Sequence, residues 1–305
     1  MEKFDVHILG CGSALPTLRH MPSAQLINLR EKLFMVDCGE GAQLAFRRSR
    51  QKFSRLSQIF ISHLHGDHIF GLIGLLSTLS LSGRTAPIYI HAHAELEHLL
   101  RPQLDFFCKG IDFDVHILPL PADGKSHIIY EDRSVEVHTI PLRHRVPSCG
   151  FLFKEKAVLP HIRRDMIDFL HIPYYAINSI KQGADWTTEE GDFYPNERLV
   201  MPADPGRSYA YCSDTCYKPD IIPLLKDVDV LYHEATFGKE FIRRAEETLH
   251  STAEQAAMMA RDAQVRRLVI GHFSSRYDSD EGLLAEAQAV FPQTSLANEG
   301  LVIHV

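Results

Sequence analysis

Four potential metal ligands occupy six consecutive positions in His63-Leu64-His65-Gly66-Asp67-His68. With Ser62 before it, this segment directly follows residues 57–61, a run that predicts a buried strand. Because side chains alternate along extended chain, we expect His63 and His65 to point the same way, and Gly66 permits a sharp turn toward a second metal. Imidazole and carboxylate ligands without a nearby thiolate are typical of hydrolytic zinc, and a merely polar loop does not account for the spacing.

The amino-acid composition is typical of a globular protein. With 305 residues and 45% hydrophobic content, it can bury one large core or two moderate ones. The N-terminus enters a strand pattern without a leader segment, and the longest apolar run, 69–81, is too short to span a membrane. The six cysteines lack the spacing of a disulfide framework. We therefore expect a cytoplasmic protein with reduced thiols.

Charge does not identify a partner by itself. The net charge of −7 disfavours indiscriminate binding to polyanions, whereas basic clusters at 47–52 and 143–145 suit phosphate contacts. For either cluster taken alone, a solvated helix face or loop is the simpler interpretation.

Strand and helix patterns alternate loosely along both halves of the chain. The strand patterns lie at 4–9, 24–29, 33–36, 57–61, 87–91, 113–118, 134–140, 208–212, 228–232 and 267–270. The helical patterns lie at 41–49, 69–81, 96–106, 252–263 and 280–290. This order predicts an α/β fold in which two mixed sheets pack face to face with helices outside.

Residues 154–207 interrupt the alternation. Five prolines and a polar run at 181–191 indicate an insertion rather than core. Within it, 159–170 predicts a short helix with Arg163 and Arg164 on one face. Such a protrusion either grips a macromolecule or is a plain surface excursion, and the pattern leaves both open. We interpret the chain as one domain, 1–305, with an inserted arm at about 154–207.

Two hydrolytic metal sites need more ligands than one loop supplies. Three candidates directly follow other predicted strands: His144, Asp214 and His272. Strand ends from distant parts of the sequence meet at one edge of a sheet, so these side chains can converge. The remaining histidines of strand patterns lack a following Asp-His pair and are expected to pack or to face solvent: His7, His91, His93, His116, His138 and His304.

Five further motifs accompany the histidine loop along nearly the whole chain: Asp37-Cys38-Gly39-Glu40-Gly41, Ser213-Asp214-Thr215, His233-Glu234-Ala235-Thr236, His250-Ser251-Thr252 and Gly271-His272-Phe273-Ser274-Ser275-Arg276-Tyr277. The histidine loop resembles the signature of the metallo-β-lactamase-fold superfamily. Together with the other motifs, it resembles the ribonuclease Z family of tRNA 3′-end endonucleases in its short bacterial form. The resemblance implies a four-layer αββα sandwich with a protruding insertion.

The resemblance also implies seven ligands for two zinc ions in each subunit: His63, His65 and His144 for one, Asp67, His68 and His272 for the other, and Asp214 between them. Asp37 would then orient the histidine loop as an acceptor behind the ligands. A turn carboxylate before Gly39 is the simpler interpretation of the same residue.

Three residues are candidates for proton transfer. Asp67 would accept a hydrogen bond from the attacking water, and His250 would protonate the ribose 3′-oxygen as it leaves. Residues 251–254 predict a capping box, which places His250 before the positive end of a helix. Because this dipole opposes protonation, a carboxylate must compensate, and the paired family motifs suggest Glu234.

The implied substrate is precursor tRNA, cut to leave a 3′-hydroxyl on the tRNA and a 5′-phosphate on the trailer. The arm at about 154–207 would clamp the tRNA elbow from the other subunit of a homodimer, by shape and phosphate contacts. Neither DNA nor a membrane is an expected partner. The arm departs from the family pattern, because its glycine-proline stretch reads 171–175, His-Ile-Pro-Tyr-Tyr, here.

A second departure lies in the loop at 15–21. Many family members carry Pro-x-Lys-x-Arg-Asn there, a loop linked to rejection of mature CCA ends. This chain keeps Pro16 but has Leu18, His20 and Met21 at the lysine, arginine and asparagine positions. The treatment of CCA ends therefore stays open.

Two other functions share these ligands. A metallo-hydrolase of a small ester or cyclic nucleotide would keep the zinc centre but would be indifferent to basic surface residues such as Arg163 and Arg164. A scaffold without catalysis would lack metal ligands, and none is missing here.

Overall fold

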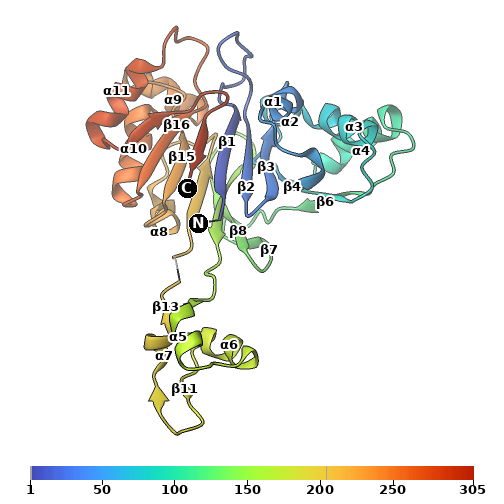
Figure 1. Cartoon of the computed structure of the whole chain (residues 1–305). Coiled ribbons are helices and arrows are strands. Elements are labelled where there is room, and N and C mark those ends of the chain that lie inside the picture. The colour runs from blue at the N-terminus through green and yellow to red at the C-terminus, as the bar shows by residue number, and fades with distance from the viewer. Residues whose placement is uncertain (1, 204) are drawn as a thin grey trace. The chain divides into compact units, whose positions relative to one another are not determined.

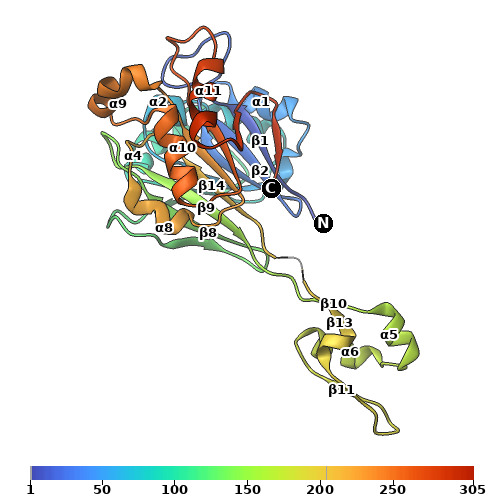
Figure 2. The ribbon, with the colours of Figure 1, turned by 90° about the vertical axis from the view of Figure 1, so that its left-hand side faces the viewer.

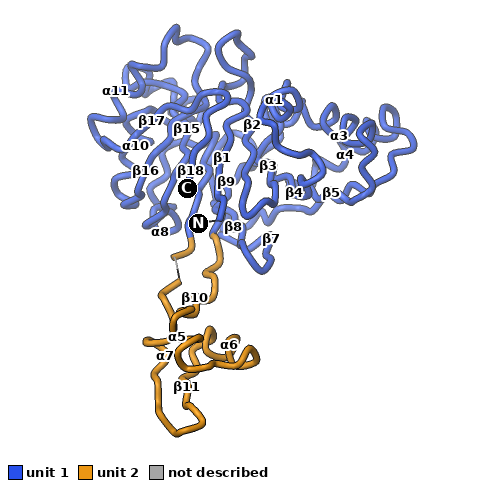
Figure 3. The backbone as a smooth tube through the Cα atoms, viewed as in Figure 1, with its two compact units in different colours: residues 1–154, 207–305 blue, residues 155–206 orange. Residues whose placement is uncertain are grey.

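The computed structural model describes residues 2–203 and 205–305. The chain separates into two compact units, one formed by 1–154 and 207–305 and the other by 155–206 (Figure 3). All six cysteines are free. No helix among the described residues has the length and apolar character that crossing a membrane requires.

The first sheet of the larger unit has seven strands in the order β18-β1-β2-β3-β4-β5-β6. Their bounds are Phe4–Gly10 (β1), Ala24–Leu29 (β2), Lys32–Cys38 (β3), Leu56–Phe60 (β4), Ile88–Ala92 (β5), Val115–Pro119 (β6) and Val302–His304 (β18). The pairs β1/β18, β1/β2 and β2/β3 are antiparallel, whereas β3 to β6 are parallel. The carboxyl ends of β3, β4 and β5 therefore lie at one edge of the sheet.

The second sheet has seven strands in the order β17-β16-β15-β14-β9-β8-β7. Their bounds are Ile128–Glu131 (β7), Val135–Pro141 (β8), Cys149–Glu155 (β9), Ser208–Cys212 (β14), Val230–Glu234 (β15), Arg267–Gly271 (β16) and Thr294–Leu296 (β17). Strands β14 to β17 run parallel, and β9 is antiparallel to β14. The carboxyl ends of β14, β15 and β16 thus also share one edge.

Helices cover the outer face of each sheet (Figures 1 and 2). The first sheet carries α1 (Ala42–Arg48), α3 (Leu72–Leu81) and α4 (Leu96–Phe107), and the second carries α10 (Ala253–Asp262) and α11 (Glu281–Val290). Strand β3 shows why its residues 33–36 are all apolar: Phe34 and Val36 pack between the sheets, whereas Leu33 and Met35 pack under the outer helices. The predicted four-layer αββα sandwich is confirmed.

Short elements connect these layers. They are the helices α2 (Gly66–Ile69), α8 (Ile222–Leu225) and α9 (Ile242–Thr248) and the 3-10 turns η1 (Phe53–Arg55), η2 (Pro219–Ile221) and η3 (Lys239–Phe241). In the larger unit, α2 follows the histidine-rich strand end and α9 precedes His250.

The smaller unit, called here the inserted segment (155–206), has its own apolar cluster, which contains Ile172, Ile180 and Leu199. Its elements are β10 (His161–Ile162), α5 (Arg164–Phe169), α6 (Tyr174–Lys181), β11 (Trp186–Thr187), β12 (Phe193–Tyr194), α7 (Asn196–Leu199) and β13 (Val200–Met201). The predicted helix at 159–170 is wrong in its first half, because residues 161–162 pair with β13 as a strand.

Candidate metal centre and active site

The histidine loop leaves the carboxyl end of β4 and turns into α2. Gly66 is the first residue of α2, where the extended chain at His65 turns into the helix, and its φ is not left-handed. A Cβ at Gly66 would lie 2.2 Å from two atoms of the Phe70 ring, which explains the small residue by close packing. The short helix then directs Asp67 and His68 toward the second sheet.

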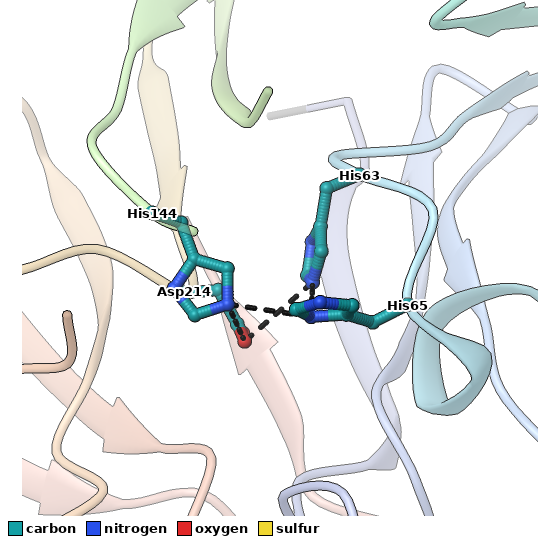
Figure 4. Close-up of side chains that lie close together, drawn as sticks. All are labelled: His63, His65, His144 and Asp214. Atoms are coloured by element: carbon teal, nitrogen blue, oxygen red, sulfur yellow. Dashed lines mark hydrogen bonds and ion pairs between the residues drawn. The ribbon is translucent and has the colours of Figure 1, made fainter. Parts of the chain in front are cut away.

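His63, His65, His144 and Asp214 form the first group of candidate ligands (Figure 4). The side chains point toward one another from the histidine loop, the segment after β8 and the segment after β14. His65 Nδ1 lies 3.0 Å from His63 Nε2 and 3.3 Å from His144 Nε2. Asp214 Oδ2 lies 3.6 Å from the Nε2 atoms of both His63 and His144.

Asp67, His68 and His272 form the second group. Asp67 Oδ2 lies 3.4 Å from His68 Nε2 and 3.6 Å from His272 Nε2. The same two nitrogens lie 3.2 Å and 3.0 Å from Asp214 Oδ1. Asp214 therefore presents one carboxylate oxygen to each group, as a bridging ligand would.

A pair of divalent cations fits this arrangement of donors. The Nε2 atoms of His68 and His272 are buried and have no hydrogen-bond partner in the part of the chain that the structure describes. Buried polar atoms without partners are costly, and here they face carboxylate oxygens at ligand-to-ligand distances. Nitrogen and carboxylate donors without thiolate are the set that catalytic zinc sites use.

Hydrogen bonds behind the ligands turn each Nε2 atom inward. His68 Nδ1 donates to Asp37 Oδ2 at 2.7 Å, and His144 Nδ1 donates to the Leu249 carbonyl at 3.1 Å. His272 Nδ1 lies 2.9 Å from Thr236 Oγ1. Such partners fix the tautomer and the ring orientation of a metal ligand.

His250 and Glu234 are in direct contact. His250 Nδ1 lies 3.0 Å from Glu234 Oε1, and the carboxylate also accepts backbone hydrogen bonds from Thr215 and Ser251 at 2.6 Å and 3.0 Å. Burial lowers the pKa of His250, but the Glu234 carboxylate outweighs burial and raises it. The Glu234 carboxylate thus stabilises the protonated form of His250.

The cap of α10 differs from the expected one. Thr252, not Ser251, is the N-cap, and its hydroxyl accepts from Gln255 N while the Gln255 side chain accepts from Thr252 N. The predicted box at 251–254 is therefore wrong by one residue, because Ser251 Oγ instead donates to the Thr215 carbonyl. His250 still lies just before this helix.

The charges of the two groups compensate one another. Burial would raise the pKa of the Asp67 carboxyl, but His68 and His272 lower it well below its usual range. Burial opposes protonation of His272, whereas Asp214 and Asp67 raise its pKa to about 10. The two groups of candidate ligands thus hold buried negative charge on Asp67 and Asp214, which protons on the histidines or metal cations can neutralise.

Three site residues have left-handed backbone conformations that the sequence did not predict. They are Asp37, Asp214 and His272, with φ of 56°, 55° and 60°. This region is uncommon for residues other than glycine, and such outliers occur where surrounding structure fixes a functional side chain. Each of them lies at or within two residues of the carboxyl end of a strand.

A hollow of about 430 Å³ lies over the two groups. Its lining includes candidate ligands, His250 and three arginines, Arg145, Arg244 and Arg276. Arg145 belongs to the basic cluster at 143–145 that the sequence suggested for phosphate contacts. Arg244, Arg276, Phe237, Ser62 and Tyr211 were not among the candidate site residues. Phe237 and Arg276 adjoin or lie in recognised motifs, whereas Tyr211 is an ordinary strand residue. His91 does not join the site, and its Nε2 lies 2.9 Å from Gln58 Oε1.

Two family models match parts of the chain. Residues 4–166 match the model described as anti-Pycsar protein Apyc1, and residues 189–273 match the beta-lactamase superfamily domain. Among curated proteins, the ribonuclease Z of Phocaeicola vulgatus is 59% identical over 305 residues, which cover 100% of this chain and 98% of that protein. The ribonuclease Z of Parabacteroides distasonis is 53% identical over 305 residues and covers 100% of both chains.

Solved structures show the same fold. Human tRNase Z, short form, has a TM-score of 0.72 and 26% identity over 99% of both chains. The metallo-beta-lactamase fold protein YhfI from Bacillus subtilis has a TM-score of 0.70 and 18% identity over 100% of both chains. The second likeness concerns the fold alone.

Proposed function

Since this chain belongs to the ribonuclease Z family and is a metallo-hydrolase nuclease, we propose that it removes the 3′ trailer from precursor tRNA. The products are a tRNA with a 3′-hydroxyl and a trailer with a 5′-phosphate. The observation that carries the proposal is the identity of 59% over the full length of a curated ribonuclease Z, together with the two facing groups of candidate ligands.

Seven side chains are proposed to hold two Zn²⁺ ions in each subunit. The ligands are His63, His65 and His144 for one ion, Asp67, His68 and His272 for the other, and Asp214 for both. Bound zinc supplies Lewis acidity to the phosphodiester and to the attacking water.

Asp67 is the proposed general base. Asp67 lines the hollow, and the neighbouring imidazoles keep the pKa of its carboxyl low, so the carboxylate stays ionised and can accept a hydrogen bond from water. The Asp67→Ala variant is expected to lose turnover while it still binds precursor tRNA, as measured by cleavage and by gel-shift titration. Retained turnover would contradict this role.

His250 is the proposed general acid, with Glu234 as its positioning partner. The 3.0 Å contact between His250 Nδ1 and Glu234 Oε1 leaves Nε2 to donate a proton to the departing ribose oxygen. A ribose alkoxide leaves poorly without this proton, whereas p-nitrophenolate needs none.

His250→Ala is therefore expected to slow precursor tRNA cleavage by roughly 10²- to 10⁴-fold and to slow hydrolysis of bis(p-nitrophenyl) phosphate much less. The control is His98→Ala, at an exposed histidine of α4, which should change neither rate. An equal loss on both substrates would show that His250 does not act on the leaving group.

The remaining features of the enzyme follow from the same proposal. We place it in the cytoplasm as a homodimer, with the inserted segment (155–206) as the arm that holds the tRNA. Leu18, His20 and Met21 replace the residues that many relatives carry in the 15–21 loop, so precursors with and without encoded CCA should be compared directly.

One experiment tests the function. Zinc-loaded protein is incubated with a precursor tRNA, and both new ends are mapped, with Asp67→Ala as the inactive control. The expected ends are a 3′-hydroxyl on the tRNA and a 5′-phosphate on the trailer. An enzyme that leaves the precursor intact but hydrolyses a cyclic nucleotide or another small ester would favour the alternative substrate class.

A further inference from the structure

Arg276 lies in the wall of the hollow over the candidate metal ligands. It lies four residues after the candidate ligand His272, which directly follows β16, so this strand also fixes the start of the segment that carries Arg276. Arg276 itself is exposed, and its position allows contact with a substrate that enters from solvent.

Two aromatic rings hold the guanidinium of Arg276. Its Cζ atom lies 4.9 Å from the centroid of Phe237 and 4.6 Å from the centroid of Phe241. Its Nε atom donates to Ser274 Oγ at 3.1 Å. These three contacts restrain a side chain that otherwise has considerable rotational freedom.

The aromatic rings are themselves anchored. Phe237 packs edge to face on His250 with centroids 6.1 Å apart, and Phe241 packs edge to face on Tyr277 at 6.3 Å. Tyr277 Oη accepts from Gly238 N at 2.7 Å and donates to Glu240 Oε1 at 3.1 Å. The guanidinium is thus positioned by the same segments that position the proposed acid.

The terminal nitrogens of Arg276 have no acceptor among residues 2–203 and 205–305, and no carboxylate there forms an ion pair with it. Arg244, in the same wall, differs because its Nη1 atom lies 3.4 Å from Glu247 Oε2. A restrained guanidinium with free Nη groups is preorganised for two parallel hydrogen bonds to a phosphate.

We propose that Arg276, held against Phe237 and Phe241, is a specificity-determining residue that binds a phosphate flanking the scissile one on the RNA. This inference rests on the proposed function. The scissile phosphate belongs to the two groups of candidate ligands, whereas Arg276 lines the same hollow without being one of them, so we assign to it the neighbouring phosphate of the RNA chain. Phosphate binding by arginine positions RNA without reading its sequence.

The experiment compares Arg276→Gln with the wild type in cleavage of a precursor tRNA. We expect KM to rise about tenfold with a smaller change in kcat, as for loss of one charge-assisted contact. The slope of log(kcat/KM) against log salt concentration should become shallower by about one unit. The loss should be smaller on bis(p-nitrophenyl) phosphate, which has no second phosphate.

Two variants complete the test. Arg243→Gln removes the same charge from a neighbouring exposed residue outside the hollow and should leave KM and the salt slope unchanged. Phe241→Leu removes one restraining ring, keeps the charge and should raise KM by less than Arg276→Gln. Thermal unfolding confirms that each variant is folded.

Two results would overturn the inference: a wild-type KM and salt slope in Arg276→Gln, or an equal loss on RNA and on bis(p-nitrophenyl) phosphate. Both are distinguishable from failure of the proposed function, in which the wild type itself would not cut the precursor.

Discussion

Asp37 joins the histidine loop to both sheets. It is the penultimate residue of β3 in the first sheet, and its carboxylate accepts from Ser62 N at 2.7 Å and from His68 Nδ1 at 2.7 Å. Tyr211, in β14 of the second sheet, also donates to it at 2.7 Å. One buried carboxylate therefore fixes a strand end, the loop and a candidate ligand at once.

Asp37→Asn is expected to lower zinc affinity by roughly 10- to 100-fold, because the amide NH₂ would face groups that can only donate or are already donating. Competition with a chromophoric chelator measures the affinity. Asp229→Asn is the matched control: this carboxylate accepts from Ser208 N at 2.8 Å and lies outside the hollow. Unchanged zinc affinity in Asp37→Asn would show that the carboxylate does not orient the ligand.

At the level of residues, the spacing within the histidine loop and the ends of the predicted strands were enough to predict seven candidate metal ligands. The structure brings the side chains of these seven residues together. The partners behind them were less accessible to sequence. Asp37 and Glu234 lie in recognised motifs, but the Leu249 carbonyl and the Tyr211 hydroxyl reach the site only through tertiary packing. Local pattern carries no information on such long-range contacts.

Among the elements, the loop between β1 and β2 is attached to the C-terminal part of the chain by His20. The imidazole is 7% exposed and lies between two carboxylates, with Nε2 2.9 Å from Asp280 Oδ2 and Nδ1 3.1 Å from Glu299 Oε2. Arg19 pairs with the same Asp280, and Cys11 Sγ lies 3.3 Å from His20 Nδ1.

Hydrogen bonds from His20 to Asp280 and Glu299 raise its pKa from 6.5 to about 9, against the effect of burial. A raised pKa in the folded state stabilises the protein fully below about pH 6.5, and this contribution is lost as pH rises through about 9. The unfolding free energy of the wild type should therefore exceed that of His20→Gln most at pH 6.

The difference in unfolding free energy between the wild type and His20→Gln should shrink by up to about 3 kcal/mol between pH 6 and pH 9.5. One pKa unit corresponds to about 1.4 kcal/mol. Urea unfolding of both proteins at pH 6, 7.5 and 9.5 measures it, and comparison of the two cancels the titration of shared groups. A difference that does not depend on pH would show that His20 is not held as an imidazolium.

Elements with a strong local period were predicted best. Strand β14 has the predicted bounds 208–212, and α10 and α11 lie within the predicted ranges. Strands β17 and β18 were not predicted, because each has only three residues and depends on a partner strand. Strand β18 pairs with β1 at the other end of the sequence, and β17 pairs in parallel with β16 after a crossover. Residues 161–162 form a strand for the same reason, since their partner β13 lies 38 residues later in sequence.

For the whole molecule, the inserted segment (155–206) is the part whose role the sequence left most open. It contains nine acidic and five basic residues, so it does not have the positive charge that phosphate contacts favour. It instead exposes aromatic side chains, Phe169, Tyr174, Tyr175 and Phe193. If this segment holds RNA, stacking on unpaired bases must contribute more than charge.

The inserted segment should be removable without loss of the metal centre. All seven candidate ligands lie outside it, and Lys154 pairs with Ser208 across β9 and β14, so a two-residue Asn-Gly turn can connect Glu155 to Arg207. The shortened chain is expected to fold and to bind as much zinc per chain as the full-length protein, measured by metal analysis. Its KM for precursor tRNA should rise on the order of tenfold or more, because one set of contacts is lost. A folded but metal-free product would show that the centre depends on this segment, and an unchanged KM would exclude the segment from substrate binding.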